Sequence, residues 1–189
     1  MLAVLDANVL FPTVLREILS DVVAAGLVRP VWSERILEEW TRAAQKLGPM
    51  DADIAKGEAA ILQARFPDAM TPGDEACAIG FDLPDPADRH VLAAGIETGA
   101  DVIVTMNLRD FPRPAMTAAG LRALHPDAFL TDLWAHDPDP VAAAAHAAHA
   151  KANALGAAIG LRALMKRARL PRLGRALAAN ANIVYENLN

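Results

Sequence analysis

The sequence predicts an α/β fold in which helices flank a doubly wound sheet of parallel strands, with a C-terminal helical extension. Three short apolar runs, at residues 2–5, 28–32 and 102–105, are typical of strands buried on both faces. Helical patterns separate these runs along the chain. Alternation of strands and helices favours a parallel sheet covered by helices.

Each of the first two runs leads into a helix. Pro12 suits the first turn of a helix with apolar residues three and four positions apart, and Gly26 stops that pattern. Ser33 is a good N-cap for the next helix, whose apolar stripe includes Trp40. A further helix is expected over residues 52–65.

The later elements follow a turn-rich segment at residues 67–86. A helix through residues 91–96 is closed by Gly99, before the third apolar run. Two short helical patterns, at residues 117–124 and 128–136, complete the first domain.

A linker is expected at Asp137-Pro138-Asp139-Pro140, because a residue that precedes proline disfavours the helical region. We therefore divide the chain into a domain at residues 1–136 and a helical extension at residues 137–189. One helix of the extension is expected from about residue 152 to residue 170.

Composition narrows the class of protein. The 189 residues are 53% hydrophobic and 22% charged, with a net charge of −5, a balance that excludes intrinsic disorder. Residues 1–136 hold 11 basic and 20 acidic residues, whereas residues 137–189 hold 7 and 3, so the charges are −9 and +4. Cys77 is the single cysteine, which rules out an internal disulfide. We expect a cytoplasmic protein with no membrane segment.

Polar residues follow the ends of two predicted strands. Asp6 and Asn107 should face one crevice, because ligands of an open parallel sheet bind outside the carboxyl ends of its strands. If the helices that carry Glu39 and Asp88 border this crevice, three carboxylates and an amide meet there. Such an oxygen cluster suits Mg²⁺ or Mn²⁺. Zinc is not expected, because no histidine is expected near these positions.

Each of these residues also has a structural interpretation. Asp85 before Pro86 fits an N-cap, and Asp88 then falls at a position that the helix dipole favours for a carboxylate. Glu38 and Glu39 can instead be solvated charges that pair with neighbouring arginines.

Four segments, in a fixed order along the chain, support the prediction of a metal site. They are Leu5-Asp6-Ala7-Asn8-Val9-Leu10, Trp32-Ser33 through Glu38-Glu39, Asp85-Pro86-Ala87-Asp88 with Val91-Leu92-Ala93-Ala94, and Val104-Thr105-Met106-Asn107-Leu108-Arg109-Asp110-Phe111. Over about residues 1–135 the sequence resembles the PIN-domain family of metal-dependent ribonucleases, which includes VapC-type toxins.

The resemblance implies a role for individual residues. Asp6 would be the first metal ligand, with Asn8 as its hydrogen-bonding partner and Thr105 supporting the site. Glu39, rather than Glu38, matches the helical glutamate of the family, and Asp88 matches its central acid.

One position departs from the family pattern. The family often has Asp two residues after the strand-end Thr, where this chain has Asn107. The loss of one negative charge is expected to weaken metal binding and puts a two-metal mechanism in doubt. Asp110 restores the charge if its loop turns inward, and is otherwise an ordinary loop carboxylate.

The implied function is a Mg²⁺- or Mn²⁺-dependent endoribonuclease of the VapC toxin type, cutting RNA to leave a 5′-phosphate and a 3′-hydroxyl. A small antitoxin partner and a homodimer are implied by the resemblance alone. One alternative is a PIN-like module that binds RNA or protein through a weakened metal site. Another is a haloacid dehalogenase-like phosphatase, although that class needs an aspartate where this chain has Asn8.

The cationic tail suggests a second RNA contact. Arg162, Lys166 and Arg169 recur at spacings of four and three on the expected helix, so they should project from one face. They would either contact RNA phosphates or remain solvated beside an apolar stripe that docks on the main domain.

Overall fold

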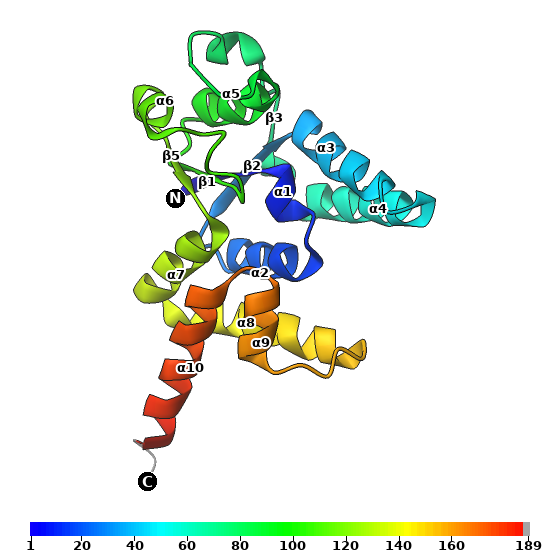
Figure 1. The fold of residues 1–189 in the computed structure, drawn as a ribbon, viewed down its shortest axis with the longest axis vertical. Coiled ribbons are helices and arrows are strands. Elements are labelled where there is room, and N and C mark those ends of the chain that lie inside the picture. Colours follow the sequence, from blue (N-terminus) through cyan, green and yellow to red (C-terminus); the bar gives the residue numbers. More distant parts are fainter. Residues whose placement is uncertain (187–189) are drawn as a thin grey trace. The chain divides into compact units, whose positions relative to one another are not determined.

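A computed structural model describes residues 1–186, with side chains described as far as Ala179. It contains a five-stranded sheet in the order β3-β2-β1-β4-β5, in which every neighbouring pair is parallel (Figure 1). The strands are β1 (Leu2–Leu5), β2 (Arg29–Ser33), β3 (Met70–Thr71), β4 (Val102–Val104) and β5 (Arg122–Leu124). The predicted fold class, parallel strands flanked by helices, is confirmed.

The chain forms two compact units that interleave along the sequence. One unit comprises residues 1–11 and 26–125, and the other comprises residues 12–25 and 126–186 of the described chain. These units do not follow the expected division after residue 136. That functional division stays a prediction, which a truncation described below tests.

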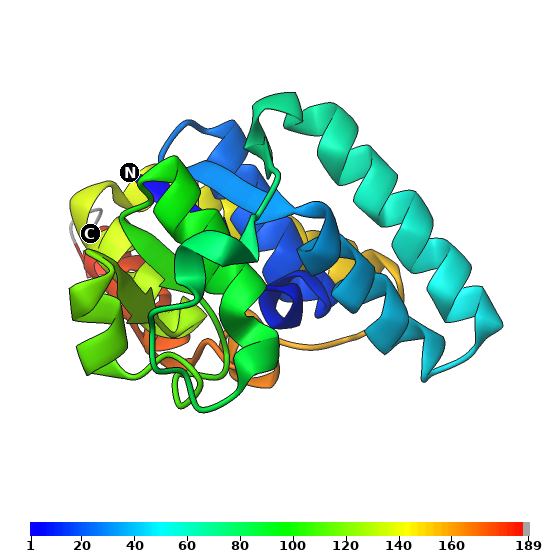
Figure 2. The same cartoon turned by 90° about the horizontal axis from the view of Figure 1, so that it is seen from above.

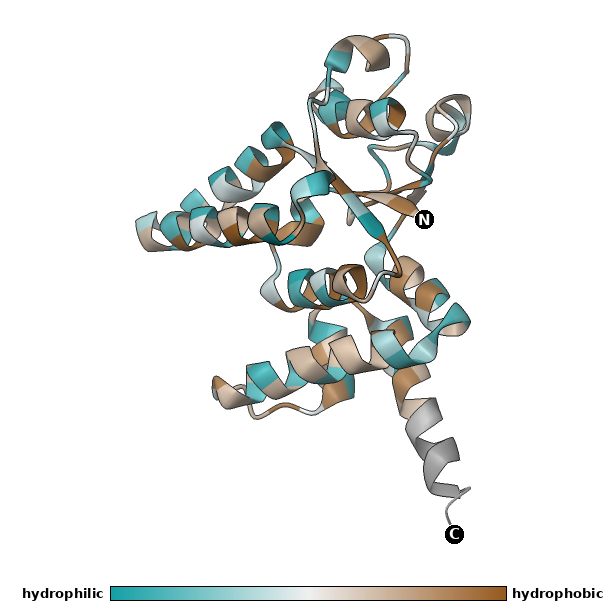
Figure 3. Ribbon diagram, turned by 180° about the vertical axis from the view of Figure 1, so that it is seen from behind, coloured by the Kyte–Doolittle hydropathy of each residue, from teal (hydrophilic) through white to brown (hydrophobic). Residues whose placement is uncertain are grey.

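The first unit contains the sheet and the helices that pack around it. Its helices are α1 (Ala7–Leu10), α3 (Glu34–Gln45), α4 (Pro49–Arg65), α5 (Arg89–Thr98) and α6 (Arg113–Ala118). Helix α5 packs on β1, β2 and β4, while α3 and α4 form a hairpin (Figure 2). Figure 3 colours the residues of β1 and β4 as hydrophobic, as expected for strands buried on both faces, whereas β2 begins with hydrophilic residues. Trp32 and Trp40 both lie in the core.

The second unit is helical. It consists of α2 (Thr13–Ala24), α7 (Pro126–His136), α8 (Pro138–Ala154), α9 (Leu161–Arg167) and α10 (Pro171–Glu186). Helix α2 packs on α8, and Lys151 of α8 forms an ion pair with Glu17 of α2. The Asp127 carboxylate accepts hydrogen bonds from the backbone N–H groups of Arg172 and Leu173 at 3.0 Å, which caps the start of α10.

Two expected features near the domain boundary were wrong. Residues 117–124 do not form a helix, because α6 ends at Ala118 and residues 122–124 pair with β4 as strand β5. Residues 137–140 are not a linker, because α8 begins at Pro138. A proline in the first helical turn needs no N–H donor there, so this segment starts a helix without losing a hydrogen bond.

The expected helix over residues 152–170 was also wrong. Helix α8 ends at Ala154, and Gly156 then adopts a φ of 90°, which other residues rarely adopt. Helix α9 begins only at Leu161. In addition, no helix within the described residues is long and apolar enough to cross a membrane.

Candidate active site

The site lies where the strand order reverses. From β1 the sheet continues through β2 to β3 on one side and through β4 to β5 on the other. Chain connections therefore leave the carboxyl ends of β1 and β4 in opposite directions, which opens a crevice between them. Asp6 follows β1 and Thr105 follows β4, and the Asp6 N–H donates to the Val104 carbonyl at 3.2 Å.

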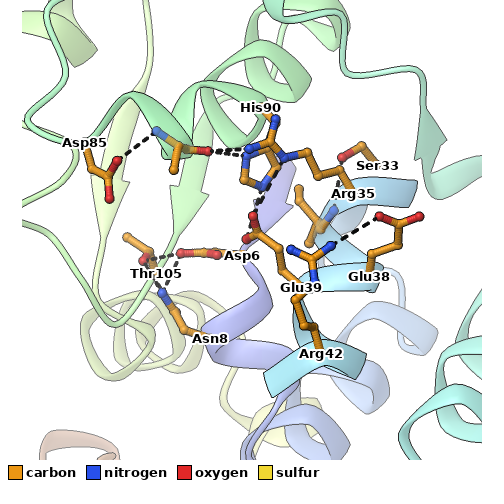
Figure 4. A network of polar contacts seen from close by, with 12 residues as sticks. Asp6, Asn8, Ser33, Arg35, Glu38, Glu39, Arg42, Asp85, His90 and Thr105 are labelled. Carbon is orange, nitrogen blue, oxygen red and sulfur yellow. Dashed lines mark hydrogen bonds and ion pairs between the residues drawn. The ribbon is translucent and has the colours of Figure 1, made fainter. Parts of the chain in front are cut away.

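Asp6 is held by side chains from both strand ends (Figure 4). Its Oδ2 accepts hydrogen bonds from Asn8 Nδ2 and Thr105 Oγ1, each at 2.6 Å. Asn8 is fixed in turn, because its Oδ1 accepts a hydrogen bond from the Met106 N–H at 2.8 Å. The structure thus places Asn8 and Thr105 against Asp6, as the resemblance implied.

Burial gives the Asp6 carboxylate an unusual electrostatic environment. Asp6 is 6% exposed and Thr105 is fully buried. Burial raises the pKa of Asp6 above its usual range, although the hydrogen bonds from Thr105 and Asn8 oppose that rise. A cation beside Asp6 would relieve the cost of keeping this carboxylate ionised.

Glu39 reaches the same crevice from α3, which Ser33 caps by accepting a hydrogen bond from the Ile36 N–H at 3.3 Å. The Oε1 atom of Glu39 lies 3.8 Å from Arg35 Nε. Glu38 is exposed and lies 3.7 Å from Arg42, and it does not line the cavity that Glu39 lines.

His90 is the residue that sequence reasoning missed. It is 1% exposed on the first turn of α5, and its Nδ1 donates to the Ala87 carbonyl at 2.7 Å. Its Nε2 lies 3.3 Å from Glu39 Oε2, which is ion-pair distance without hydrogen-bond geometry (Figure 4). The expectation that no histidine falls near the site was therefore wrong. The packing of α5 beside α3 brings His90 there, and only its position two residues after Asp88 hinted at this.

The environment of Glu39 differs from that of Asp6. Burial alone would raise the pKa of Glu39, but His90 and the neighbouring arginines Arg35 and Arg42 outweigh burial and lower it. Glu39 is therefore ionised over the whole neutral range.

Asp88 completes the acidic group at the end of a short 3₁₀ turn (Pro86–Asp88). Asp85 caps this turn by accepting a hydrogen bond from the Ala87 N–H at 2.8 Å, so its structural interpretation is confirmed. Burial first, and then the negative charges of Asp110, Asp6 and Asp85, raise the pKa of Asp88 to about 7. A hydrogen bond between the Asp88 and Asp110 carboxyl groups adds to this rise.

The loop after β4 turns inward. Asn107 and Asp110 both line the cavity, and Asn107 Nδ2 donates to Asp110 Oδ2. The cavity has a volume of about 340 Å³. Its lining includes the three acidic residues expected from sequence, Asp6, Glu39 and Asp88. It also includes Asp110, for which the sequence left an inward and an outward position open.

The donor set suits a hard divalent cation. Its possible ligand atoms are carboxylate and amide oxygens. Burial, together with the charges of neighbouring carboxylates, raises the pKa values of Asp6 and Asp88, and a bound cation would oppose that rise. Among the described residues, no three His, Cys, Asp or Glu side chains already converge in a ready metal cluster. Mg²⁺ commonly binds through one or two carboxylates and several waters, so a spread set of donors is compatible with it.

Comparison with known proteins agrees with this architecture. A family model described as "PIN domain" matches residues 3–109. The chain belongs to the PIN-domain family. The match includes Asp6, Glu39, Asp88 and Asn107, and it ends just before Asp110.

A curated relative gives a more local comparison. A 45-residue stretch of this PIN-domain chain is 56% identical to "Putative ribonuclease VapC50" of Mycobacterium tuberculosis. The matched stretch covers 24% of this chain and 27% of the relative, so the chain spans about a quarter of the relative's length. No solved structure matches.

The acidic cluster of this PIN domain predicts a pH-dependent effect of Asp88→Asn in the presence of chelator. Because folding raises the pKa of Asp88 from 3.8 to about 7, the wild-type chain loses stability relative to the variant as pH rises from about 4 to about 7. After allowance for solvent screening, the variant should gain about 1 to 2 kcal/mol in free energy of unfolding at pH 8 and nothing below pH 4. Denaturant unfolding at both pH values measures this.

Asp68→Asn is the matched control, because it makes the same chemical change at an exposed position outside the cluster. Equal effects of the two substitutions at pH 8 would show that Asp88 is not under electrostatic stress.

Proposed function

We propose that this chain is a Mg²⁺- or Mn²⁺-dependent endoribonuclease of the VapC type. The observation that carries the proposal is that three acidic side chains, Asp6, Glu39 and Asp88, line one cavity at the reversal point of the sheet. Membership of the PIN-domain family and the name of the partial relative support a nuclease. The phosphatase alternative receives no support from either comparison.

The metal would be held by Asp6, Asp88 and Glu39. When bound, a divalent cation supplies charge neutralisation at a phosphate oxygen and lowers the pKa of a water molecule. Asn8 and Thr105 orient Asp6, while His90 and Arg35 contact the carboxylate of Glu39.

Asp88 and Asn107 add to this site. In the metal-free chain the pKa of Asp88 is about 7, and a bound divalent cation would favour its ionised form. Asn107 sits at the mouth of the cavity, exposed to solvent, where its amide can orient a water or a phosphate. No protein nucleophile is required for this reaction, because the attacking group is water.

Cleavage of RNA by the purified chain tests the proposal. A mixture of labelled single-stranded RNAs is incubated with Mg²⁺, with Mn²⁺ and with EDTA. Endonucleolytic products that need the divalent ion support a nuclease. The weakened site that Asn107 suggests makes a binding module the second candidate, and RNA retention without cleavage, unchanged by EDTA, would favour it.

The substitution Asn107→Asp should tighten Mn²⁺ binding. It adds a carboxylate at the cavity and removes the Nδ2 donor that contacts Asp110, so the two negative charges repel until a cation lies between them. Titration calorimetry should show at least about tenfold tighter binding, which is about 1.4 kcal/mol. The control is Gln63→Glu, which adds the same charge to a side chain that does not line the cavity. Unchanged affinity in Asn107→Asp would place Asn107 away from the metal.

The resemblance also implies a small antitoxin partner and a homodimer in the cytoplasm, and we propose both partners on that ground alone. This chain can be co-expressed with the product of a short neighbouring reading frame and purified. Light scattering then measures the mass of the particle, which reports both antitoxin binding and dimer formation.

A further inference from the structure

A second cavity lies in the helical unit, between α9 and α10. Its volume is about 610 Å³. Three small residues, Gly160, Ala163 and Pro171, form part of its wall. The other lining residues are all cationic, namely Arg162, Lys166 and Arg175.

These cations are not quite the set that the sequence predicted. Arg162 and Lys166 lie one turn apart on α9, as expected. The prediction that Arg169 is the third residue on that helix face was wrong, because α9 ends at Arg167. Arg169 lies beyond the helix and adopts a φ of 61°. Arg175 of α10 lines the cavity instead.

Close packing of the two helices creates this arrangement. A Cβ atom added at Gly174 would lie 2.9 Å from the Met165 Cβ, closer than side chains approach one another. The glycine therefore lets α10 lie directly against α9. Since Arg175 is the next residue, its side chain is brought to the cavity that Arg162 and Lys166 already line.

The charges of this cavity are not balanced by the described part of the chain. Arg162, Lys166 and Arg175 are exposed, and none forms an ion pair with a described carboxylate. Residues 160–179 contain six basic residues and no acidic residue. A concave surface with three uncompensated cations attracts an anion that can contact several of them together.

We propose that the α9–α10 cavity binds backbone phosphates of single-stranded RNA. The proposal rests on the proposed function, which makes RNA the polyanion that this chain must hold. Residues 1–136 carry a net charge of −9 and repel RNA, so attraction must come from a local cationic surface. Guanidinium groups suit phosphate, because their fork of N–H donors contacts two oxygens at once.

The test measures RNA binding without cleavage. The full chain carrying Asp6→Asn is titrated with a fluorescent single-stranded oligonucleotide in EDTA, over a series of salt concentrations. The cavity variant adds Arg162→Gln, Lys166→Gln and Arg175→Gln. The control variant instead adds Arg167→Gln, Arg169→Gln and Arg172→Gln, which removes the same charge from exposed side chains of the same segment outside the cavity.

The cavity variant should lose about two units of log–log salt slope, at about 0.7 per phosphate contact, and at least about tenfold in affinity at low salt. The control should lose less than half of either quantity. Equal losses in the two variants would overturn the proposal, because they would show that RNA responds to the net charge of the segment and not to the cavity. Unchanged binding in the cavity variant would also overturn it.

Two further measurements separate other outcomes. The single variant Arg175→Gln should stay folded, as its thermal transition shows, and should lose part of the log–log salt slope of RNA binding. A salt slope equal to that of the parent chain would overturn the proposal. Polyglutamate that displaces RNA at matched charge concentration would overturn it in favour of an acidic protein. Failure of the wild-type chain to cleave RNA with Mn²⁺ would contradict the proposed function, while the binding comparison still reports on the cavity.

Discussion

Replacing Asp6 by Asn should lower the rate of RNA cleavage at least about 100-fold, a loss of about 2.7 kcal/mol of transition-state stabilisation. Asn has nearly the shape of Asp, and its amide oxygen can still accept the hydrogen bonds from Asn8 and Thr105. The buried negative charge is what the substitution removes. Initial rates on a fluorogenic RNA with saturating Mn²⁺ measure the loss.

The fold should survive this change, because a carboxylate with a raised pKa opposes folding when it is ionised. Glu39→Gln and Asp88→Asn should show losses of similar size. Asp85→Asn is the control, since Asn also caps a helical turn and Asp85 does not line the cavity. Full activity in the Asp6 variant would defeat the assignment as a nuclease.

A chain that ends at His136 should fail to give a stable, soluble protein. The side chains buried along α2 are Leu15, Arg16, Ile18, Leu19, Val22 and Val23, and α2 packs on α8, which this truncation removes. Exposing a buried Leu, Ile or Val side chain costs about 1.5 to 3 kcal/mol. Two or three of them amount to a large share of the stability of a typical domain, about 5 to 15 kcal/mol.

Solubility and a thermal melt measure the effect of the truncation. Lys151→Ala in the full chain is the control, because it removes the ion pair with Glu17 and keeps the helix packing. An exposed ion pair contributes only about 0.2 to 1 kcal/mol, so the control should melt close to the wild type. A soluble fragment 1–136 with a cooperative transition would instead support the division of the chain at that point.

The parts of the fold that sequence predicts well are those with a strong local pattern. Continuous apolar runs locate β1, β2 and β4, and the hydroxyl of Ser33 marks the start of α3. Strands β3 and β5 each contain a polar residue, Thr71 and Arg122, and so form no continuous apolar run. Only their pairing with β2 and β4 makes them strands. Their existence depends on contacts distant in sequence.

The residues of the candidate site also fall into those that the sequence predicts and those that depend on distant contacts. Asp6 and Asn107 could be placed because the ends of parallel strands share one edge of the sheet. His90 could not be placed, because its approach to Glu39 depends on how α5 packs beside α3. Arg175 was missed for a similar reason, because it lies beyond the helix expected over residues 152–170 and only the packing of α10 against α9 brings it to the cavity.

The pairing of α2 with α8 has a consequence for the synthesis of the protein. Helix α2 is complete at residue 24, and α8 begins at residue 138, which is 114 residues later. At about 5 to 20 residues per second, the ribosome needs roughly 6 to 23 s to cover that interval. Throughout that interval, the side of α2 that packs on α8 lacks this partner. We therefore expect slower translation between the two helices to lower the fraction of newly made chain that reaches its native state.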